Sequence, residues 1–202
     1  MRAPRIVVIG TSLGGLHALQ TVLSQLPQDF SLPVAVVQHR HKDSNDRLPV
    51  ILQQYTKLRV WDADDKQQIK PGNVYLAPAD YHLLIEGNTF SLSTDEPVKY
   101  SRPSIDVLFE SAVESCGDGV VAVVMTGANE DGTAGAKRVA QIGGTVLVQD
   151  PSTAEAPEMP TGVVREVKGA EVLKLSEIGP RLDKIAKLGK ITRGLKSRRS
   201  GQ

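Results

Sequence analysis

The sequence predicts an α/β fold: a doubly wound, mostly parallel sheet with helices on both faces and an antiparallel hairpin. Two observations predict it. Apolar runs at residues 6–9, 34–37 and 120–125 lack polar alternation, which is typical of strands buried on both faces. Segments with helical periodicity follow these runs, as expected for parallel strands joined by right-handed crossovers.

The first predicted strand, residues 6–9, ends in a glycine-rich turn that carries Ser12. Beyond it, apolar residues recur at helical spacing from Leu16 onward. The turn therefore presents a hydroxyl near a helix N-terminus, where free N–H groups stabilise negative charge. The letters G-x-S-x-G match a nucleophile elbow, but such a turn is more often a phosphate or dinucleotide cradle. Both interpretations stay open at this point.

The second predicted strand, residues 34–37, is followed by Gln38 and His39. A dinucleotide site needs an acidic side chain near this position to bind the ribose hydroxyls, and the first turn lacks the G-x-G-x-x-G spacing. Nucleotide binding is therefore disfavoured. Because ligands of parallel sheets bind beyond the carboxyl ends of strands, we expect Ser12 and His39 at one edge, on neighbouring strands.

The middle of the chain is predicted to hold a helix capped by Ser44 or Asn45, two short strands, and an antiparallel hairpin attached to the parallel sheet. The carboxylates between Asp62 and Asp65 are interpreted as a solvated turn rather than metal ligands. These elements are the helix at residues 44–55, the strands at 58–61 and 74–77, and the hairpin at 82–92.

The second half of the chain repeats the strand and helix alternation. Ser104 is predicted to cap a helix with a buried stripe. The most apolar strand is predicted to be central and to break at a turn that contains Asp131. The remaining elements are that strand at residues 120–125, a helix through 137–140, a strand at 145–148, a proline-rich loop at 150–160, and a last strand and helix between 172 and 188.

Length and composition limit the class of protein. With 202 residues, 40% hydrophobic, the chain suits one core, and we expect one domain over residues 1–189. Residues 190–202 are basic and without periodicity, which predicts a disordered tail. A net charge of +1 gives no indication of nucleic acid as a partner. No apolar run approaches the roughly 20 residues of a membrane span, and a single cysteine, Cys116, favours a reducing compartment, the cytoplasm.

Ser12, His39 and Asp131 each follow a buried strand of the predicted parallel sheet, so we expect them at one rim. A serine hydroxyl is a poor nucleophile at neutral pH. It needs an imidazole to take its proton and a carboxylate to orient that imidazole. The chain order Ser, His, Asp differs from that of α/β-hydrolases, so the G-x-S-x-G letters do not indicate that family.

Each of these residues also has a plainer interpretation. Ser12 could serve only as a helix cap. His41 is a rival base, although it would point away from a group that His39 serves. Asp131 could be an N-cap for the next helix, and Glu130 or Asn129 could take its place.

Several motifs follow one another in a fixed order through residues 5–188. They are IGTSLGG at 9–15, VQH at 37–39, KPGNVYLAP at 70–78, His82 with the apolar residues after it, SRPSIDVLF at 101–109, and VMTG at 124–127 followed by DG at 131–132 and AG at 134–135. With these motifs the chain resembles the catalytic domain of the bacterial chemotaxis protein-glutamate methylesterase family, CheB.

The resemblance implies a serine hydrolase that cleaves glutamate methyl esters, and also deamidates glutamine, on the cytoplasmic helices of methylated chemoreceptors. It implies Ser12 as nucleophile, His39 as base and Asp131 as carboxylate, with no metal or cofactor. Backbone N–H groups near Leu13 and Ala128 are the candidates for the oxyanion site. The partner would be the chemoreceptor cytoplasmic domain, with no nucleic acid and no membrane insertion.

The chain departs from the family pattern in three places. Leu13 stands where the family usually has Thr or Ser, and residues 128–130, Ala-Asn-Glu, replace the usual Met-Gly-Asn. We also expect no receiver domain, because the first strand begins within a few residues of Met1. These departures motivate an alternative hypothesis, a divergent, non-catalytic module that binds a helical signalling partner through the same rim.

Overall fold

The computed structural model describes the chain apart from residues 1–4, 41–46 and 200–202. Its centre is a seven-stranded parallel sheet with the strand order β3-β4-β2-β1-β7-β8-β9. The strands are β1 (Ile6–Thr11), β2 (Val34–Gln38), β3 (Arg59–Asp62), β4 (Asn73–Leu76), β7 (Val120–Val124), β8 (Thr145–Gln149) and β9 (Glu171–Leu173). The predicted doubly wound parallel sheet is confirmed.

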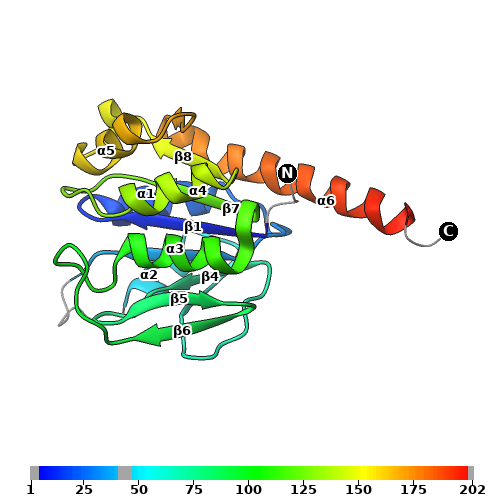
Figure 1. Cartoon of the computed structure of the whole chain (residues 1–202), viewed down its shortest axis with the longest axis horizontal. Helices are drawn as coiled ribbons and strands as arrows, with labels where there is room; N and C mark the ends of the chain where they lie inside the picture. The colour runs from blue at the N-terminus through cyan, green and yellow to red at the C-terminus, as the bar shows by residue number, and fades with distance from the viewer. Residues whose placement is uncertain (1–4, 41–46, 200–202) are drawn as a thin grey trace.

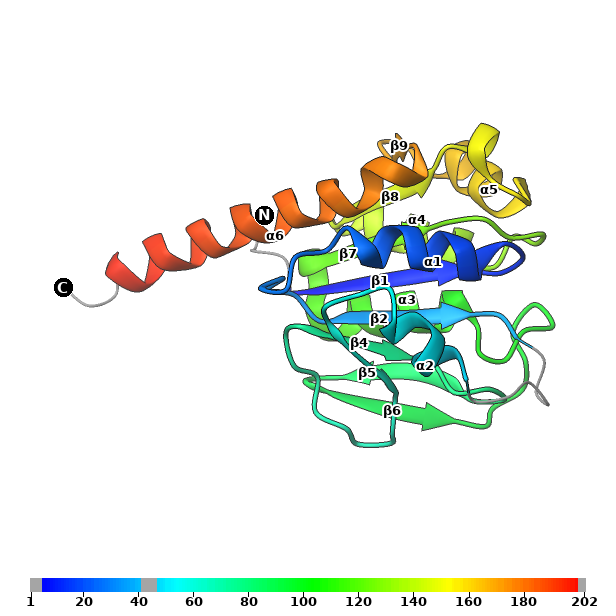
Figure 2. The same cartoon turned by 180° about the vertical axis from the view of Figure 1, so that it is seen from behind.

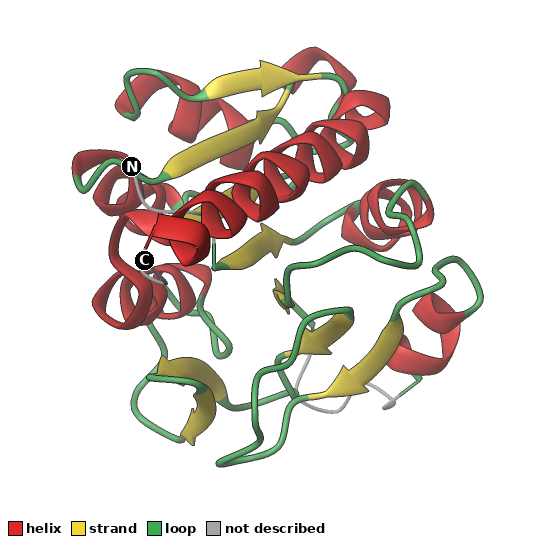
Figure 3. Ribbon diagram, turned by 90° about the vertical axis from the view of Figure 1, so that its right-hand side faces the viewer, coloured by secondary structure: helices red, strands yellow, loops and turns green. Residues whose placement is uncertain are grey.

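Helices cover both faces of this sheet (Figures 1, 2 and 3). One face packs against α1, α2 and α6, and the other packs against α3, α4 and α5. The helices are α1 (Gly15–Ser24), α2 (Leu48–Gln53), α3 (Ile105–Cys116), α4 (Thr133–Gln141), α5 (Glu158–Glu166) and α6 (Leu175–Arg199), and two short 3₁₀ helices are η1 (Gly117–Gly119) and η2 (Pro151–Thr153).

The central strand β1 explains why the sequence shows apolar runs without alternation. Its side chains alternate between the faces: Ile6 and Val8 join the core under α3 and α4, whereas Val7 and Ile9 join the core under α1 and α6. All four are at most 2% exposed. Because helices cover both faces of the sheet, the side chains of these four residues are apolar whichever face they point to.

The predicted hairpin is confirmed as β5 (His82–Glu86) and β6 (Thr89–Ser93), but it is a separate two-stranded sheet and does not extend the parallel one. It packs on α3, and serines of that helix bind the free edge of β5. Ser111 Oγ accepts a hydrogen bond from the Ile85 N–H at 3.0 Å, and Ser115 Oγ donates to the Ile85 carbonyl at 2.7 Å. These serine side chains satisfy backbone groups of β5 that a neighbouring strand would have bound if the hairpin were attached to the parallel sheet, as we expected.

Three expectations need correction. The loop predicted at 150–160 contains η2 and the start of α5, because prolines are tolerated in the first turn of a helix, where Pro160 lies. The chain is helical through Arg199, where the sequence predicts a disordered tail. Lysine and arginine are good helix formers, so a helix already nucleated upstream continues. The helix predicted at 44–55 is the shorter α2, and its predicted caps lie outside the described residues.

None of the helices in the described part of the chain is both long and apolar enough to span a bilayer. The described residues also contain no group of three or more His, Cys, Asp or Glu side chains placed to hold a metal ion. The carboxylates between Asp62 and Asp65 accordingly belong to no such group.

Candidate active site

The carboxyl ends of β1 and β2 bring Ser12 and His39 together. The two strands are paired in register, with Thr11 opposite Gln38, and Ser12 and His39 are the residues that follow. The His39 N–H donates to the Thr11 carbonyl at 3.0 Å, which continues the ladder to the start of the turn. Both residues therefore lie at one edge on neighbouring strands, as the sequence predicts.

The backbone at Ser12 is held from three directions. Its N–H donates to the Thr126 carbonyl at 2.9 Å. Its carbonyl accepts from the Gly15 N–H at 2.9 Å and from Gln38 Nε2 at 2.8 Å. Gly14, with φ of 78°, makes the left-handed reversal before α1, a conformation that glycine adopts without penalty. The turn thus fixes the position from which the Ser12 side chain projects.

The turn after β7 packs directly on the Ser12 turn. A Cβ on Gly127 would lie 3.0 Å from Ser12 Cβ and 2.5 Å from Met159 Cε, so glycine permits this approach. Thr126 Oγ1 donates to the Leu13 carbonyl at 2.8 Å and joins the two turns. Exposed Ala128 follows at once. Among the described contacts, the backbone N–H groups of Leu13 and Ala128 donate no hydrogen bond.

Asp131 lies fully buried at the N-terminus of α3, where its carboxylate accepts five hydrogen bonds. Oδ2 accepts from His39 Nε2 at 2.8 Å and from the Ile105 N–H at 2.7 Å. Oδ1 accepts from Ser104 Oγ at 2.9 Å and from the N–H groups of Asp106 and Gly132 at 3.1 and 3.0 Å. The free N–H groups of a helix start are suited to a carboxylate.

This environment sets the charge of Asp131. Burial, the largest single effect, would raise its pKa, but hydrogen bonds from His39 and the N–H groups of Ile105 and Asp106, with the charge of His39, together lower the pKa below its usual value. The carboxylate is therefore ionised at neutral pH. It accepts the proton of His39 Nε2–H, which leaves His39 Nδ1 with a free lone pair.

His39 is 12% exposed and Asp131 is 0% exposed, so their pair is shielded from water. The described hydrogen bonds do not include one between Ser12 Oγ and His39. The two side chains line the same cavity of about 570 Å³, together with Leu13, Leu16 and Glu155. The nucleophile and the imidazole therefore share one solvent-accessible space, while the carboxylate lies behind the imidazole.

Ser104 and His82 support Asp131, a role that sequence reasoning missed. Ser104 caps α3, as predicted, and it also donates to Asp131. Its own N–H donates to Nδ1 of buried His82 at 3.1 Å, and His82 Nε2 lies 3.1 Å from the Glu96 carbonyl. His82 therefore carries its proton on Nε2. The sequence signals were the motif at 101–109, which contains Ser104, and the motif that begins at His82.

Asp106 ties the next helix to the same cluster. Its Oδ1 accepts from the Gly135 N–H in the first turn of α4 at 2.7 Å, and its Oδ2 accepts from Lys99 Nζ at 2.8 Å. A Cβ on Gly135 would lie 2.6 Å from Phe109 Cβ, so the two helices approach closely here. The N-termini of α3 and α4 thus each bind a buried carboxylate.

The rival residues have other contacts. Asn129 Oδ1 accepts from the Asp131 N–H at 3.1 Å and shapes the turn, and exposed Glu130 pairs with Arg165 at 3.0 Å. His17 is exposed on α1. His41 lies outside the described residues. Asp131, and not its rival Glu130, is therefore the carboxylate that contacts His39.

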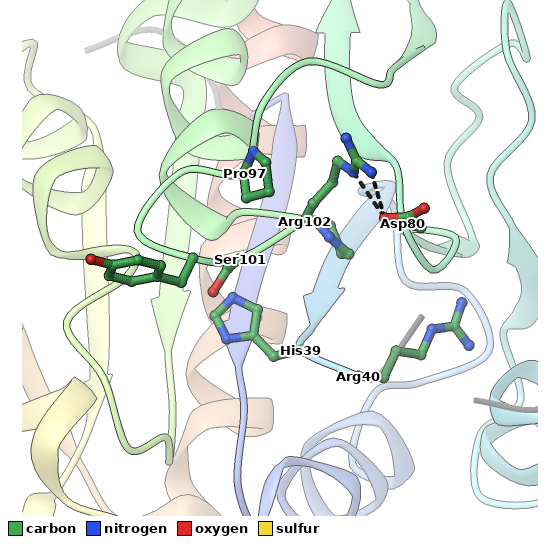
Figure 4. A pocket seen from close by; sticks show the side chains of 8 residues that line it. His39, Arg40, Asp80, Pro97, Ser101 and Arg102 are labelled. Carbon is green, nitrogen blue, oxygen red and sulfur yellow. Dashed lines mark hydrogen bonds and ion pairs between the residues drawn. The ribbon is translucent and has the colours of Figure 1, made fainter. Parts of the chain in front are cut away.

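His39 also lines a second cavity of about 420 Å³ (Figure 4). It is lined by Arg40, Asp80, Tyr100 and Arg102, among others. Arg102 donates from Nε and Nη2 to Asp80 Oδ1 at 3.0 and 2.7 Å. His39 thus contacts two cavities, one with an apolar rim and one with charged walls.

A family model described as CheB methylesterase matches residues 7–182. The crystal structure of the Thermotoga maritima CheB methylesterase catalytic domain is similar to this chain with a TM-score of 0.86 and 34% sequence identity. The match covers 91% of this chain and 99% of that domain.

Two curated relatives differ in length. A Leptospira interrogans protein, provisionally named protein-glutamate methylesterase/protein-glutamine glutaminase, is 44% identical over 173 residues, which are 85% of this chain and 90% of that protein. A Thermotoga maritima protein-glutamate methylesterase/protein-glutamine glutaminase is 35% identical over 182 residues, which are 88% of this chain but 53% of that protein. The chain thus spans nearly all of one relative and about half of the other.

Proposed function

The chain belongs to the CheB methylesterase family, and from this premise we propose that it is a protein-glutamate methylesterase that works as a serine hydrolase. One observation carries the proposal. Buried Asp131 lies 2.8 Å from His39 Nε2, and His39 lines the same cavity as Ser12, the residue after the paired strand. A hydroxyl, an imidazole and an ionised carboxylate at one sheet edge suit acyl transfer.

In the first half of the reaction, Ser12 Oγ attacks the side-chain ester carbonyl while His39 Nδ1 takes the hydroxyl proton. Asp131 stabilises the imidazolium that forms. When the tetrahedral intermediate collapses, the bond to the methoxy oxygen breaks, His39 returns the proton to that oxygen, and methanol leaves. The products of this half are methanol and an acyl ester on Ser12.

In the second half, His39 removes a proton from water and the hydroxide attacks the acyl ester. The bond to Ser12 Oγ breaks, the proton passes to that oxygen, and a glutamate carboxylate is released. The same two halves convert glutamine to glutamate with ammonia as the first leaving group. The names of the relatives support both substrates.

We assign the oxyanion site to the backbone N–H groups of Leu13 and Ala128. Both lie in turns that pack against each other at Ser12, and neither donates a hydrogen bond among the described contacts. Fixed backbone donors of this kind stabilise charge that develops on a carbonyl oxygen. Since these donors are main-chain groups, Leu13 does not need the hydroxyl that the family usually has at this position.

The substrate we propose is a methylated glutamate on the cytoplasmic helices of a chemoreceptor, with the cytoplasm as the place of action. The family description and the relatives' names support the glutamate methyl ester as the group that reacts. We assign residues 1–189 to the catalytic domain; the family model matches 7–182 within them. The apolar rim formed by Leu13, 56% exposed, and Leu16, 39% exposed, suits a helix that carries the ester.

Methanol release from a methylated chemoreceptor cytoplasmic fragment tests the proposal. We expect the wild-type chain to release methanol and Ser12→Ala to slow this release by about 10³- to 10⁶-fold, with an unchanged melting temperature. Ser24→Ala, an exposed change on α1, is the matched control and should retain wild-type rates. Wild-type turnover in Ser12→Ala contradicts the mechanism, and a folded wild-type chain that binds the fragment without releasing methanol favours the non-catalytic binding module.

A further inference from the structure

Arg40 is an unusual residue next to the reaction centre. It follows His39 directly, and its side chain is 8% exposed. Nη2 donates to the Ala77 carbonyl at 3.1 Å and makes a long contact of 3.4 Å with Asp62 Oδ1. Nε and Nη1 are also buried, and neither has a hydrogen-bond partner among the residues that the structure describes. Buried guanidinium nitrogens are almost always paired, so these donors call for an explanation.

The unpaired donors belong to a residue that lines the 420 Å³ cavity beside His39. Figure 4 shows His39 and Arg40 on one side of this cavity, across from Pro97, Ser101 and Arg102. Both Arg102 contacts with Asp80 go to the same carboxylate oxygen, and Arg102 Nη1 donates to the Thr94 and Asp95 carbonyls. Arg102 is therefore paired, and among the described residues that line this cavity the buried nitrogens without a partner are Nε and Nη1 of Arg40.

A carboxylate is the chemical group that fits these donors, because it offers acceptor oxygens and the opposite charge in a shielded site. The distances along the chain suit a carboxylate that belongs to the substrate itself. Consecutive Cα atoms such as those of His39 and Arg40 lie about 3.8 Å apart. Side chains three or four positions apart on a helix have Cβ atoms about 5–6 Å apart. Because His39 and Arg40 line the same cavity, a helix that presents an ester to His39 places the side chain one turn away next to that cavity.

We propose that Arg40 binds a carboxylate of the polypeptide substrate, carried about one helical turn from the glutamate methyl ester, and so selects esters that lie in acidic surroundings. This inference rests on the proposed function and adds a specificity determinant to it. A substrate with a neutral side chain at that position leaves the two buried donors of Arg40 without a charged acceptor, so the same contact that favours acidic substrates disfavours neutral ones.

A pair of helical peptides tests the inference. Both carry one glutamate methyl ester; one has Glu and the other Gln at the positions four residues before and after it. For the wild-type chain, we expect kcat/KM for methanol release to be about tenfold to a hundredfold higher for the Glu peptide, the range for a hydrogen bond to a charged group. In Arg40→Met, which keeps an unbranched stem but removes the charge and the donors, this ratio should fall to near one.

Two further variants make the result specific. Arg59→Met removes an exposed arginine from β3 and should leave the ratio at its wild-type value. Arg40→Lys keeps the charge and should give a ratio between those of wild type and Arg40→Met. Melting temperatures of all variants confirm that they fold. Equal rates for the two peptides in wild type, or an unchanged ratio in Arg40→Met, overturn the inference and leave the esterase proposal standing.

A binding measurement separates the two proposals. In the Ser12→Ala background, the affinity of the fluorescently labelled peptides is measured by anisotropy with Arg40 and with Met at position 40. The preference for the Glu peptide should disappear with Arg40→Met even though no turnover occurs. If the wild type releases no methanol but this preference is present, the esterase proposal fails and the carboxylate site stands. If the preference is absent, the carboxylate site is disproved.

Discussion

At the scale of single residues, Asp131 has the most strongly determined environment in the site. It is fully buried, yet five donors hold its carboxylate at the start of α3. These donors, His39 among them, keep the group ionised against the cost of burial. Because Asp131 fixes which ring nitrogen of His39 carries the proton, it controls the tautomer that the proposed reaction needs.

Asp131 should therefore make stability depend on pH. Its pKa is lowered in the folded chain from an ordinary value of 3.8. The ionised group thus stabilises the fold above that value, and this contribution is lost as the pH falls through the lower folded pKa. We expect Asp131→Asn to reduce the free energy of unfolding by about 1–3 kcal/mol at pH 7, and by less at pH 2.5.

Urea unfolding of the wild type and Asp131→Asn across this pH range measures the difference between them. A gap in unfolding free energy that narrows as the pH falls below about 3.8 agrees with an ionised, hydrogen-bonded carboxylate. A gap that stays constant, or widens, would mean that Asp131 is held in the fold in some other protonation state.

At the scale of elements, the N-terminus of α3 organises the site. Ser104 both caps this helix and donates to Asp131, and it is held in turn by His82. The hairpin and α3 thus position a carboxylate that belongs to a turn after β7. We regard Ser104 and His82 as positioning residues, because they act on the reaction through Asp131.

Ser104→Ala tests this role. The variant removes one donor to Asp131 and the cap of α3, so we expect a loss of about 1 kcal/mol in unfolding free energy and a lower kcat. Ser115→Ala, which removes a hydrogen bond between α3 and β5, is the matched control: it should cost similar stability while keeping kcat. If both variants lower kcat equally, Ser104 has only a structural role.

The elements also show how far sequence reasoning reaches. The strands β1, β2 and β7 were predictable because burial on both faces leaves a local apolar signature. These strands in turn allowed us to predict that Ser12 and His39 lie at the same edge of the sheet. The contacts of Ser104 and His82 with the Asp131 cluster were not predictable, because they join segments far apart in the sequence. Helix α5 was hidden by its prolines, which are compatible with a first turn but remove the usual helix signal.

At the scale of the whole molecule, the fold is two cores separated by one sheet. The core under α1 also holds α6, through the buried side chains of Ile178, Leu182 and Ile185. Helix α6 then extends beyond the sheet towards the C-terminus (Figures 1 and 2). The site lies at the carboxyl edge of the sheet, where loops from both sides of the sheet meet.

Leu182→Ala tests whether α6 is an integral part of this fold. Leu182 is fully buried, so the cavity left by truncation should cost about 2–5 kcal/mol of unfolding free energy. Val164→Ala, at a position 44% exposed on α5, should change stability by less than about 0.5 kcal/mol. Equal effects of the two changes in urea unfolding would mean that α6 is only loosely attached.

The whole arrangement depends on a hydroxyl, an imidazole and a carboxylate acting together at one sheet edge. Labelling of the folded chain by a fluorophosphonate, followed by mass spectrometry of its peptides, tests this most directly. We expect one adduct, on Ser12, that forms much more slowly in His39→Gln and Asp131→Asn. No adduct in the folded wild-type chain, or an adduct on Ser12 that forms at the wild-type rate in both variants, would contradict a catalytic role for these three residues.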